Sequence, residues 1–211
     1  MIKKSILVLA IFLSFCALAQ KTNTNPRKDY LVTITTNFGD MYLILYDSTP
    51  SHKANFIKLA NEKFYDSTSF HRIIKGFMIQ GGDPNSKDTD PNNDGMGGPG
   101  YTVPAEFKPK FTHNFGALAA ARMGDGTNPQ KASSGSQFYI VENKQGTHFL
   151  DNSYTVYGQV IKGLDVVEKI ADQQKDPRDR PLTDIRIKVK VELLKKKKIK
   201  KMYGFDYETL K

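Results

Sequence analysis

The chain contains many short segments with the alternating or continuous apolar pattern of β-strands, separated by turn-forming Gly, Pro, Asn and Asp residues. Two stretches, 50–62 and 163–172, instead place apolar residues at helical spacing. Together they predict a mostly β fold in which a closed β-barrel is capped by two helices. The strand segments are 31–36, 41–46, 70–74, 77–80, 117–121, 137–141, 155–160 and 185–192.

Local signals define the first elements more closely. The first two strand segments predict a β-hairpin whose turn is supplied by Gly39 and Asp40. The following helix is expected to start at Pro50, with Ser48 or Thr49 as its cap. That helix should pack one face on the sheet.

The two ends of the chain depart from this pattern. Lys3 and Lys4 precede an unbroken apolar run and the small-residue sequence 17–19, which is typical of a signal peptide cleaved after Ala19. The polar residues after it predict disorder, and the last residues are strongly basic. The expected parts are a signal peptide (1–19), a disordered leader (20–29), a folded domain (30–194) and a basic tail (195–211).

The predicted export, the charge and the cysteine content exclude several kinds of partner and reaction. The signal places the mature protein in the periplasm or outside the cell, where nucleic acid is not an expected partner. Its formal charge of +9 loses only Lys3 and Lys4, which favours weak contact with anionic surfaces. The single cysteine, Cys16, lies in the signal, so the mature chain has no thiol nucleophile; lipid attachment at Cys16 is the alternative. The four histidines show no ligand spacing, so no metal or cofactor is expected.

Two runs mix a few polar side chains with apolar and aromatic ones: Phe-His-Arg-Ile-Ile-Lys-Gly-Phe-Met-Ile-Gln-Gly-Gly-Asp at 70–83 and Ser-Gly-Ser-Gln-Phe-Tyr-Ile at 134–140. This suits strands that form an apolar pocket with a few hydrogen-bond donors. With Gly-Gly-Pro-Gly-Tyr at 97–101 and Tyr-Gly-Gln-Val at 157–160, the chain resembles the cyclophilin-type peptidyl-prolyl cis-trans isomerases over about 30–194. The resemblance implies an eight-stranded antiparallel barrel with two capping helices and a site on its outer face.

The resemblance also implies roles for individual residues. Arg72 would be the catalytic guanidinium, and Gln80 and Gln137 would hold Arg72 and the substrate backbone. The other residues of the expected proline pocket and its edge are Phe77, Met78, Ala121, Arg122, Tyr139, Phe149, Leu150 and Tyr154. The expected substrates are proline-containing polypeptides, and the protein is expected to be a monomer that needs no cofactor.

Some positions depart from the family or leave alternatives open. Phe77 and Met78 adjoin in a strand and should face opposite sides, unless a kink at Gly76 brings both to the pocket. Tyr139 stands where Phe is frequent and adds a hydroxyl expected to reach solvent. Phe149 stands where the archetypal members have Trp, which predicts weak cyclosporin binding because Phe lacks the indole donor.

The residue types fit amide isomerisation. Rotation about a prolyl amide loses resonance, and the nitrogen of the twisted amide gains a lone pair. An arginine can donate to that lone pair because it stays protonated, and an apolar pocket keeps water from competing. The expected function is therefore isomerisation of Xaa-Pro bonds during the folding of exported proteins. The alternative is a chaperone module that binds proline segments with little catalysis.

Each of two further stretches, a lysine-rich run and an acidic insertion, has both a simple structural interpretation and a more specific functional one. The run 195–201 contains six lysines and is most simply a solvated tail, although it could bind an anionic surface. The insertion 86–95 clusters Asp88, Asp90 and Asp94, whose oxygens would suit Ca²⁺, but such residues are first of all turn formers.

Overall fold

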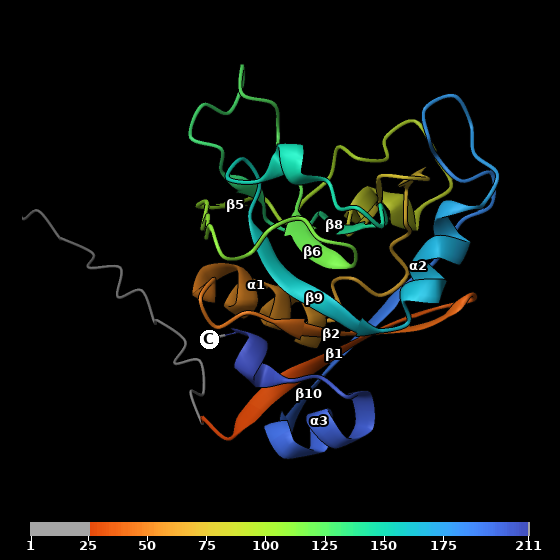
Figure 1. Ribbon diagram of the computed structural model, residues 1–211. Helices are drawn as coiled ribbons and strands as arrows, with labels where there is room; N and C mark the ends of the chain where they lie inside the picture. Colours follow the sequence, from red (N-terminus) through yellow and green to blue (C-terminus); the bar gives the residue numbers. More distant parts are fainter. Residues whose placement is uncertain (1–25, 211) are drawn as a thin grey trace, which may run out of the picture.

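The computed structural model describes residues 26–210, where eight antiparallel strands form one sheet in the order β10-β1-β2-β9-β6-β8-β4-β3 (Figure 1). These strands are β1 (Lys28–Thr36), β2 (Gly39–Leu45), β3 (Arg72–Ile74), β4 (Met78–Gly81), β6 (Ala117–Ala120), β8 (Phe138–Val141), β9 (Val156–Lys162) and β10 (Lys188–Lys195). Two short strands, β5 (Thr102–Val103) and β7 (Ser133–Ser134), pair separately. The α-helices are α1 (Pro50–Asn61), α2 (Leu164–Ala171) and α3 (Lys196–Tyr203), and 3-10 turns form at η1 (Pro84–Lys87), η2 (His148–Leu150) and η3 (Tyr207–Leu210).

The segments that precede the two edge strands close the sheet into a barrel. The residues just before β3 lie against those just before β10, and Ser69 and Arg186 form an antiparallel bridge. Phe70 N–H donates to the Ile185 carbonyl at 3.0 Å, and the Ile187 N–H donates to the Thr68 carbonyl at 2.7 Å. The predicted mostly β barrel is thereby confirmed.

The first hairpin forms as predicted, but its turn lies earlier. Gly39 already pairs with Thr36, so the turn residues are Asn37 and Phe38. Gly39 has φ +127°, which is why glycine suits the first position of β2. The helix α1 begins at Pro50 as predicted, whereas the Thr49 hydroxyl makes no cap bond and donates to the Tyr46 carbonyl at 3.2 Å.

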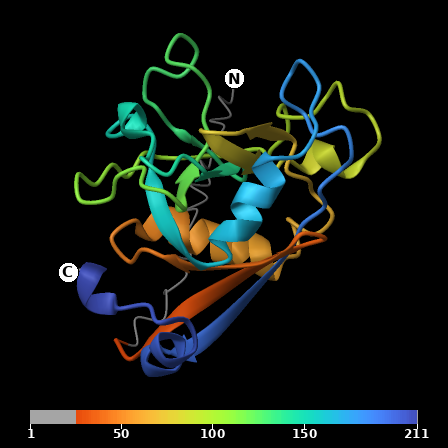
Figure 2. The ribbon, with the colours of Figure 1, turned by 45° about the vertical axis from the view of Figure 1, so that its right-hand side comes forward.

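Side chains of the central strands alternate between two apolar clusters, because neighbouring residues of a strand face opposite sides of the sheet. Ile79 and Ile140 face the barrel interior, where α1 and α2 also pack (Figure 2). Met78 and Tyr139 face outward and belong to a second cluster on the barrel surface. Since both faces are covered, β6 and β8 are buried along their whole length, which explains their continuous apolar sequences.

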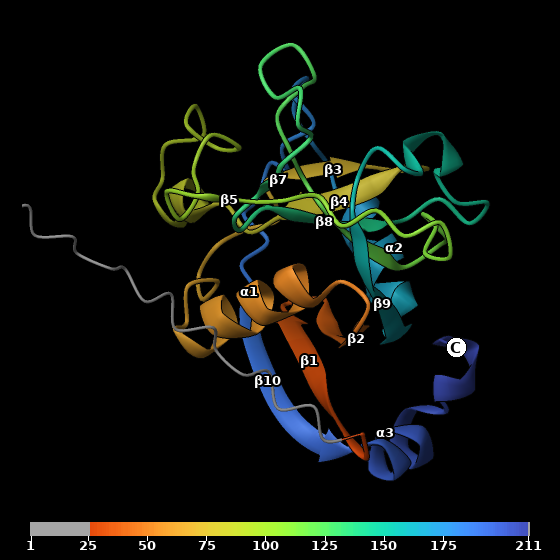
Figure 3. The same ribbon diagram turned by 90° about the vertical axis from the view of Figure 1, so that its left-hand side faces the viewer.

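The C-terminal segment is folded, which corrects the expectation of a solvated tail. β10 ends at Lys195, and α3 follows and lies against the outer face of β1 and β2, at the opposite end of Figure 3 from β3 and β4. Ile199 is fully buried between Leu31 and Ile44. This docking is hard to predict from the sequence, because the run 195–201 contains one apolar residue and six lysines and is therefore strongly polar on average.

The folded domain also begins before residue 30, where it was expected to start. β1 starts at Lys28, and the Asp29 carboxylate accepts a hydrogen bond from Lys53 Nζ at 2.6 Å. Both side chains are buried, so this ion pair fixes the start of the barrel. The predicted signal peptide lies outside the described residues. In the part of the chain from 26 to 210, no helix combines the length and apolar character that a membrane crossing requires.

Candidate functional site

A cavity of about 150 Å³ lies on the outer face of the barrel, above β4 and β8. It contains nine of the predicted site residues, namely Arg72, Phe77, Met78, Gln80, Ala121, Arg122, Tyr139, Leu150 and Tyr154. The structure thus brings together residues that are spread over more than eighty positions of the sequence. We call this cavity, defined by these nine residues, the outer-face pocket.

The order of residues in β4 and the turn before it create one wall of the outer-face pocket. Met78 and Gln80 are two apart and therefore face the same side of the sheet. Gly76 has φ +74°, and the Phe77 N–H closes a turn by donating to the Ile74 carbonyl at 3.0 Å. Phe77 consequently precedes the regular strand and lines the pocket beside Met78, as the predicted kink required.

Arg72 lies at the start of β3, opposite Gln80 on β4. Its side chain is 41% exposed, and its Nε lies 3.9 Å from the Asp179 carboxylate. The expectation that Gln80 holds Arg72 stays a prediction: the Gln80 amide nitrogen donates to Gln137 Oε1 at 3.1 Å, and the amide oxygen is the group that would accept from the guanidinium. The ion-pair contact between the guanidinium and Asp179 is loose.

Gln137 supports the pocket from behind and does not line it. Its amide nitrogen donates to the carbonyls of Gly95 and Gly97 at 3.0 and 2.8 Å, so its oxygen is left to accept from Gln80. Gln80 Nε2 also lies 3.4 Å from His71 Nε2. Burial lowers the pKa of His71 despite the neighbouring carboxylates, so the ring is neutral and can accept at this nitrogen.

Arg122 has a defined side-chain position at the other edge of the pocket. Its guanidinium donates to the Ser153 carbonyl at 2.8 Å and pairs with the Asp125 carboxylate at 2.5 Å. It also lies 4.4 Å from the centre of the Tyr154 ring, which is a cation–π contact. The Arg122 side chain is only 4% exposed, so it serves as a fixed wall of the pocket.

Phe149 departs from its expected place. It is 75% exposed and does not line the cavity, although its ring stacks on Phe77 with centroids 5.8 Å apart. Its neighbour Leu150 is the residue of this turn that enters the pocket. A 3-10 turn directs successive side chains to different sides, so only one of the two can face the cavity.

The sequence interpretation missed two residues beneath the pocket. The hydroxyl of Tyr139 does not reach solvent as expected; it lies 2.8 Å from Nε2 of His113, which is fully buried. The other ring nitrogen of His113 lies 2.6 Å from Asp151 Oδ1. Tyr139 and Asp151 lie 26 and 38 positions from His113, so no local sequence motif could have connected the three residues.

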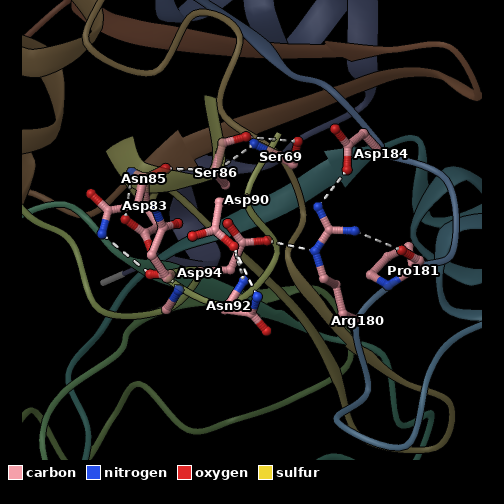
Figure 4. A network of polar contacts seen from close by, with 12 residues as sticks. Ser69, Asp83, Asn85, Ser86, Asp90, Asn92, Asp94, Arg180, Pro181 and Asp184 are labelled. Carbon is pink, nitrogen blue, oxygen red and sulfur yellow. Dashed lines mark hydrogen bonds and ion pairs between the residues drawn. The ribbon is translucent and has the colours of Figure 1, made fainter. Parts of the chain in front are cut away.

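The acidic insertion forms ion pairs within the protein (Figure 4). Asp94 pairs with Arg180 at 2.6 Å, and the same guanidinium pairs with Asp184 at 2.7 Å. Asp88 and Asp90 accept hydrogen bonds from their own loop. Between residues 26 and 210, no cluster of three His, Cys, Asp or Glu side chains is placed to hold a metal ion. The Arg180 ion pairs attach the insertion to the loop that carries Asp179.

Fold and site together define a class of protein: a closed antiparallel β-barrel with a small pocket of apolar, aromatic and polar side chains on its outer face and an arginine at the pocket wall. Residues 31–191 match the family described as cyclophilin type peptidyl-prolyl cis-trans isomerase/CLD. The chain belongs to the cyclophilin family of peptidyl-prolyl cis-trans isomerases.

Individual relatives agree with this assignment. The peptidyl-prolyl cis-trans isomerase CYP18-1 of Arabidopsis thaliana is 40% identical over 161 residues, which cover 74% of this chain and 91% of the plant protein. A cyclophilin type peptidyl-prolyl cis-trans isomerase of Cryptosporidium parvum, solved in the presence of the dipeptide Ala-Pro, superposes with a TM-score of 0.67 at 30% identity, covering 77% of this chain and 98% of that one. The fold also matches AquaCyp293 from Hirschia baltica, with a TM-score of 0.59 at 22% identity and 77% and 76% coverage.

Proposed function

We propose that the outer-face pocket is the active site of this isomerase and that Arg72 is its catalytic residue. The observation that carries the proposal is the placement of a half-exposed guanidinium at a cavity of about 150 Å³ that Phe77, Met78 and Leu150 help to line. A cavity of this size suits a proline ring.

The reaction requires no covalent bond to be made or broken. The planar amide resists rotation with a barrier of about 18 to 20 kcal/mol, because rotation removes the resonance between nitrogen and carbonyl. As the amide twists, the prolyl nitrogen becomes pyramidal and can accept a hydrogen bond. Arg72 donates to this nitrogen, so it binds the twisted amide more strongly than the planar one, and this difference lowers the barrier.

The pocket walls make that donation effective. Phe77, Met78 and Leu150 hold the proline ring and exclude water, which strengthens the remaining electrostatic contact. Gln80 and its partner Gln137 fix the strand opposite Arg72. Arg72 is held only loosely by Asp179, so its donors are free to follow the nitrogen as the amide twists.

Arg72→Ala tests the proposal and separates it from the alternative of a proline-binding chaperone. The measurement is the cis-to-trans exchange rate of a short Xaa-Pro peptide by NMR, together with the affinity for that peptide. We expect Arg72→Ala to lose catalysis by about 100-fold or more, the range for one removed donor to a developing charge, while peptide affinity changes little. Arg178→Ala, at an exposed arginine outside the pocket, is the matched control. Unchanged catalysis in Arg72→Ala would reject the site, and binding without catalysis by the wild type would favour the chaperone.

We further propose that the enzyme is exported, acts as a monomer and assists the folding of exported proteins. The support is the predicted signal at 1–19, and the slow uncatalysed isomerisation of prolyl bonds gives such an enzyme a role in folding. Fractionation of the source cells and mass measurement of the mature chain test export and cleavage after Ala19. Full-length protein in the cytoplasmic fraction would contradict export. The monomeric state is tested separately, by light scattering of the purified protein.

A weak contact of α3 with anionic surfaces is a second proposal. Docking through Ile199 leaves Lys197, Lys198 and Lys201 exposed on a helix of eight residues. Their charges would favour an anionic bilayer by about 1 kcal/mol each at low salt. Sedimentation with anionic vesicles tests this, and binding should disappear in the Lys197→Gln/Lys198→Gln/Lys201→Gln variant and at high salt. Equal binding to neutral vesicles would contradict it.

A further inference from the structure

The floor of the outer-face pocket continues as a chain of polar groups formed by Tyr139, His113 and Asp151. Tyr139 is 4% exposed, and its ring lies nearly parallel to that of His113, with an interplanar angle of 11°. Its hydroxyl contacts His113 Nε2 at 2.8 Å, and His113 Nδ1 contacts Asp151 Oδ1 at 2.6 Å. The backbone N–H of His113 donates to the same Asp151 oxygen at 2.8 Å. The line of contacts therefore runs from the pocket to the turn that forms its rim.

The contacts determine which atoms carry the protons. An ionised carboxylate only accepts, so Nδ1 of His113 carries a hydrogen and donates it to Asp151. In the neutral ring, Nε2 then has no hydrogen and accepts from the Tyr139 hydroxyl. The hydroxyl hydrogen is thereby directed away from the cavity, and the pocket receives only the apolar ring of Tyr139.

The same contacts hold the rim of the pocket. Asp151 follows directly on the turn η2, which contains Leu150. The Thr147 N–H donates to the His113 carbonyl at 2.8 Å, so both ends of this turn are attached to His113. One buried residue thus connects the floor residue Tyr139 with the rim residue Leu150.

We propose that His113 and Asp151 are positioning residues for the proline pocket, which act through Tyr139 and Leu150 and determine the affinity for the proline ring. The inference rests on the proposed function of the outer-face pocket. Neither residue lines the cavity, so both act without touching the substrate. Their loss should raise KM and leave kcat nearly unchanged, because rotation itself depends on Arg72.

Protonation of His113 would reverse this arrangement. A cationic ring donates from both nitrogens, so the Tyr139 hydroxyl would lose its acceptor and its hydrogen would turn toward the pocket. Burial lowers the pKa of His113 although Asp151 opposes this shift, and the neighbouring His148 adds to it. Arg122 and Tyr154, which face Tyr139 from the other side, act on the pKa of its hydroxyl and not on that of His113. Peptide affinity should therefore be constant near neutral pH and fall only in the acidic range.

The test is the dissociation constant of an Xaa-Pro peptide measured from about pH 7.5 downward, to the pH at which nitrogen NMR shows that the His113 ring has become protonated. For the wild type, we expect affinity to fall about three- to tenfold at acidic pH, the ratio that corresponds to one hydrogen bond. Tyr139→Phe should abolish this step because it has no hydroxyl to reorient. His148→Gln, which removes the exposed histidine beside Asp151, is the control and should keep the step.

Two more readouts make the outcome decisive. Nitrogen NMR of the wild-type histidines should show His113 protonated at Nδ1 alone at neutral pH, and Asp151→Asn should raise KM while keeping kcat. An acid step that persists in Tyr139→Phe, its absence from the wild type, or a proton on Nε2 would overturn the inference. If Arg72→Ala retains full catalysis, the proposed active site fails; if only the acid step fails, the site stands and the positioning role does not.

Discussion

Two parts of the barrel's outer face carry apolar side chains, and the protein covers them differently. Over β1 and β2, Leu31 and Ile44 are covered by α3 of the same chain. Over β4 and β8, neighbouring residues such as Leu150 bury Met78 and Tyr139 almost completely but leave a cavity beside them. An apolar surface that the chain covers contributes to stability, whereas one that it leaves partly open is available to a ligand. Substitutions on the two faces should therefore affect different properties.

The largest effect on stability is expected on the covered face. Ile199→Ala removes a fully buried side chain and should lower the free energy of unfolding by about 3 kcal/mol, as for other large-to-small core substitutions. Urea unfolding measures this change. Met202→Ala, in the same helix but 49% exposed, should change it by about 0.5 kcal/mol or less. Isomerase activity of the folded Ile199→Ala protein should equal that of the wild type; a large loss would show that the two faces are coupled.

The opposite result is expected on the open face. Leu150→Ala enlarges the pocket at a half-buried position and should raise KM for an Xaa-Pro peptide about tenfold, which corresponds to lost apolar contact with the proline ring. Steady-state kinetics measure this effect, and urea unfolding should show a loss of only about 1 kcal/mol, because the residue is partly exposed. If Leu150→Ala destabilises the protein as much as Ile199→Ala does, the distinction between the two faces fails.

The free energy of unfolding should depend on pH, because two histidines at the site are buried. Burial lowers the pKa of His71 and of His113 below their ordinary value of 6.5, so the unfolded chain takes up protons first as the pH falls. The free energy of unfolding should therefore decrease on acidification from about pH 7 to about pH 5. Thermal unfolding at several pH values measures this. His71→Gln should weaken the pH dependence of the free energy of unfolding. If the variant shows the same pH dependence as the wild type, the lowered pKa of His71 is contradicted.

The smallest effect is expected at the edge of the pocket. Phe149→Trp restores an indole donor at a side chain that is 75% exposed, and should strengthen cyclosporin binding by about tenfold or less, the contribution of one hydrogen bond. Calorimetric titration measures it, with Phe149→Leu as the control without a donor. Tight binding by the wild type would contradict the prediction that Phe149 weakens this ligand.

The sequence predicts the strands and the pocket because both depend on local patterns. Alternation places Met78 and Gln80 on one side of β4, and Gly76 marks the kink that adds Phe77. The docking of α3 could not be predicted in this way, since its one fully buried residue, Ile199, stands among lysines. Contacts between residues far apart in the sequence could not be predicted either. Gln80 donates to Gln137, which lies 57 positions away, and no local pattern marks Gln137 as its hydrogen-bond partner.

Closure of the barrel has a consequence for a peptidyl-prolyl isomerase. An open strand edge presents unpaired N–H and C=O groups to which an extended polypeptide can add. Here the segments before β3 and β10 bond to each other, and the Ile73 N–H on the outer edge of β3 donates to the Asp179 carbonyl at 2.8 Å. At this seam the sheet therefore offers little template for an added polypeptide strand. Under the proposed function, a peptide is held by its proline and released, instead of being added there as another strand.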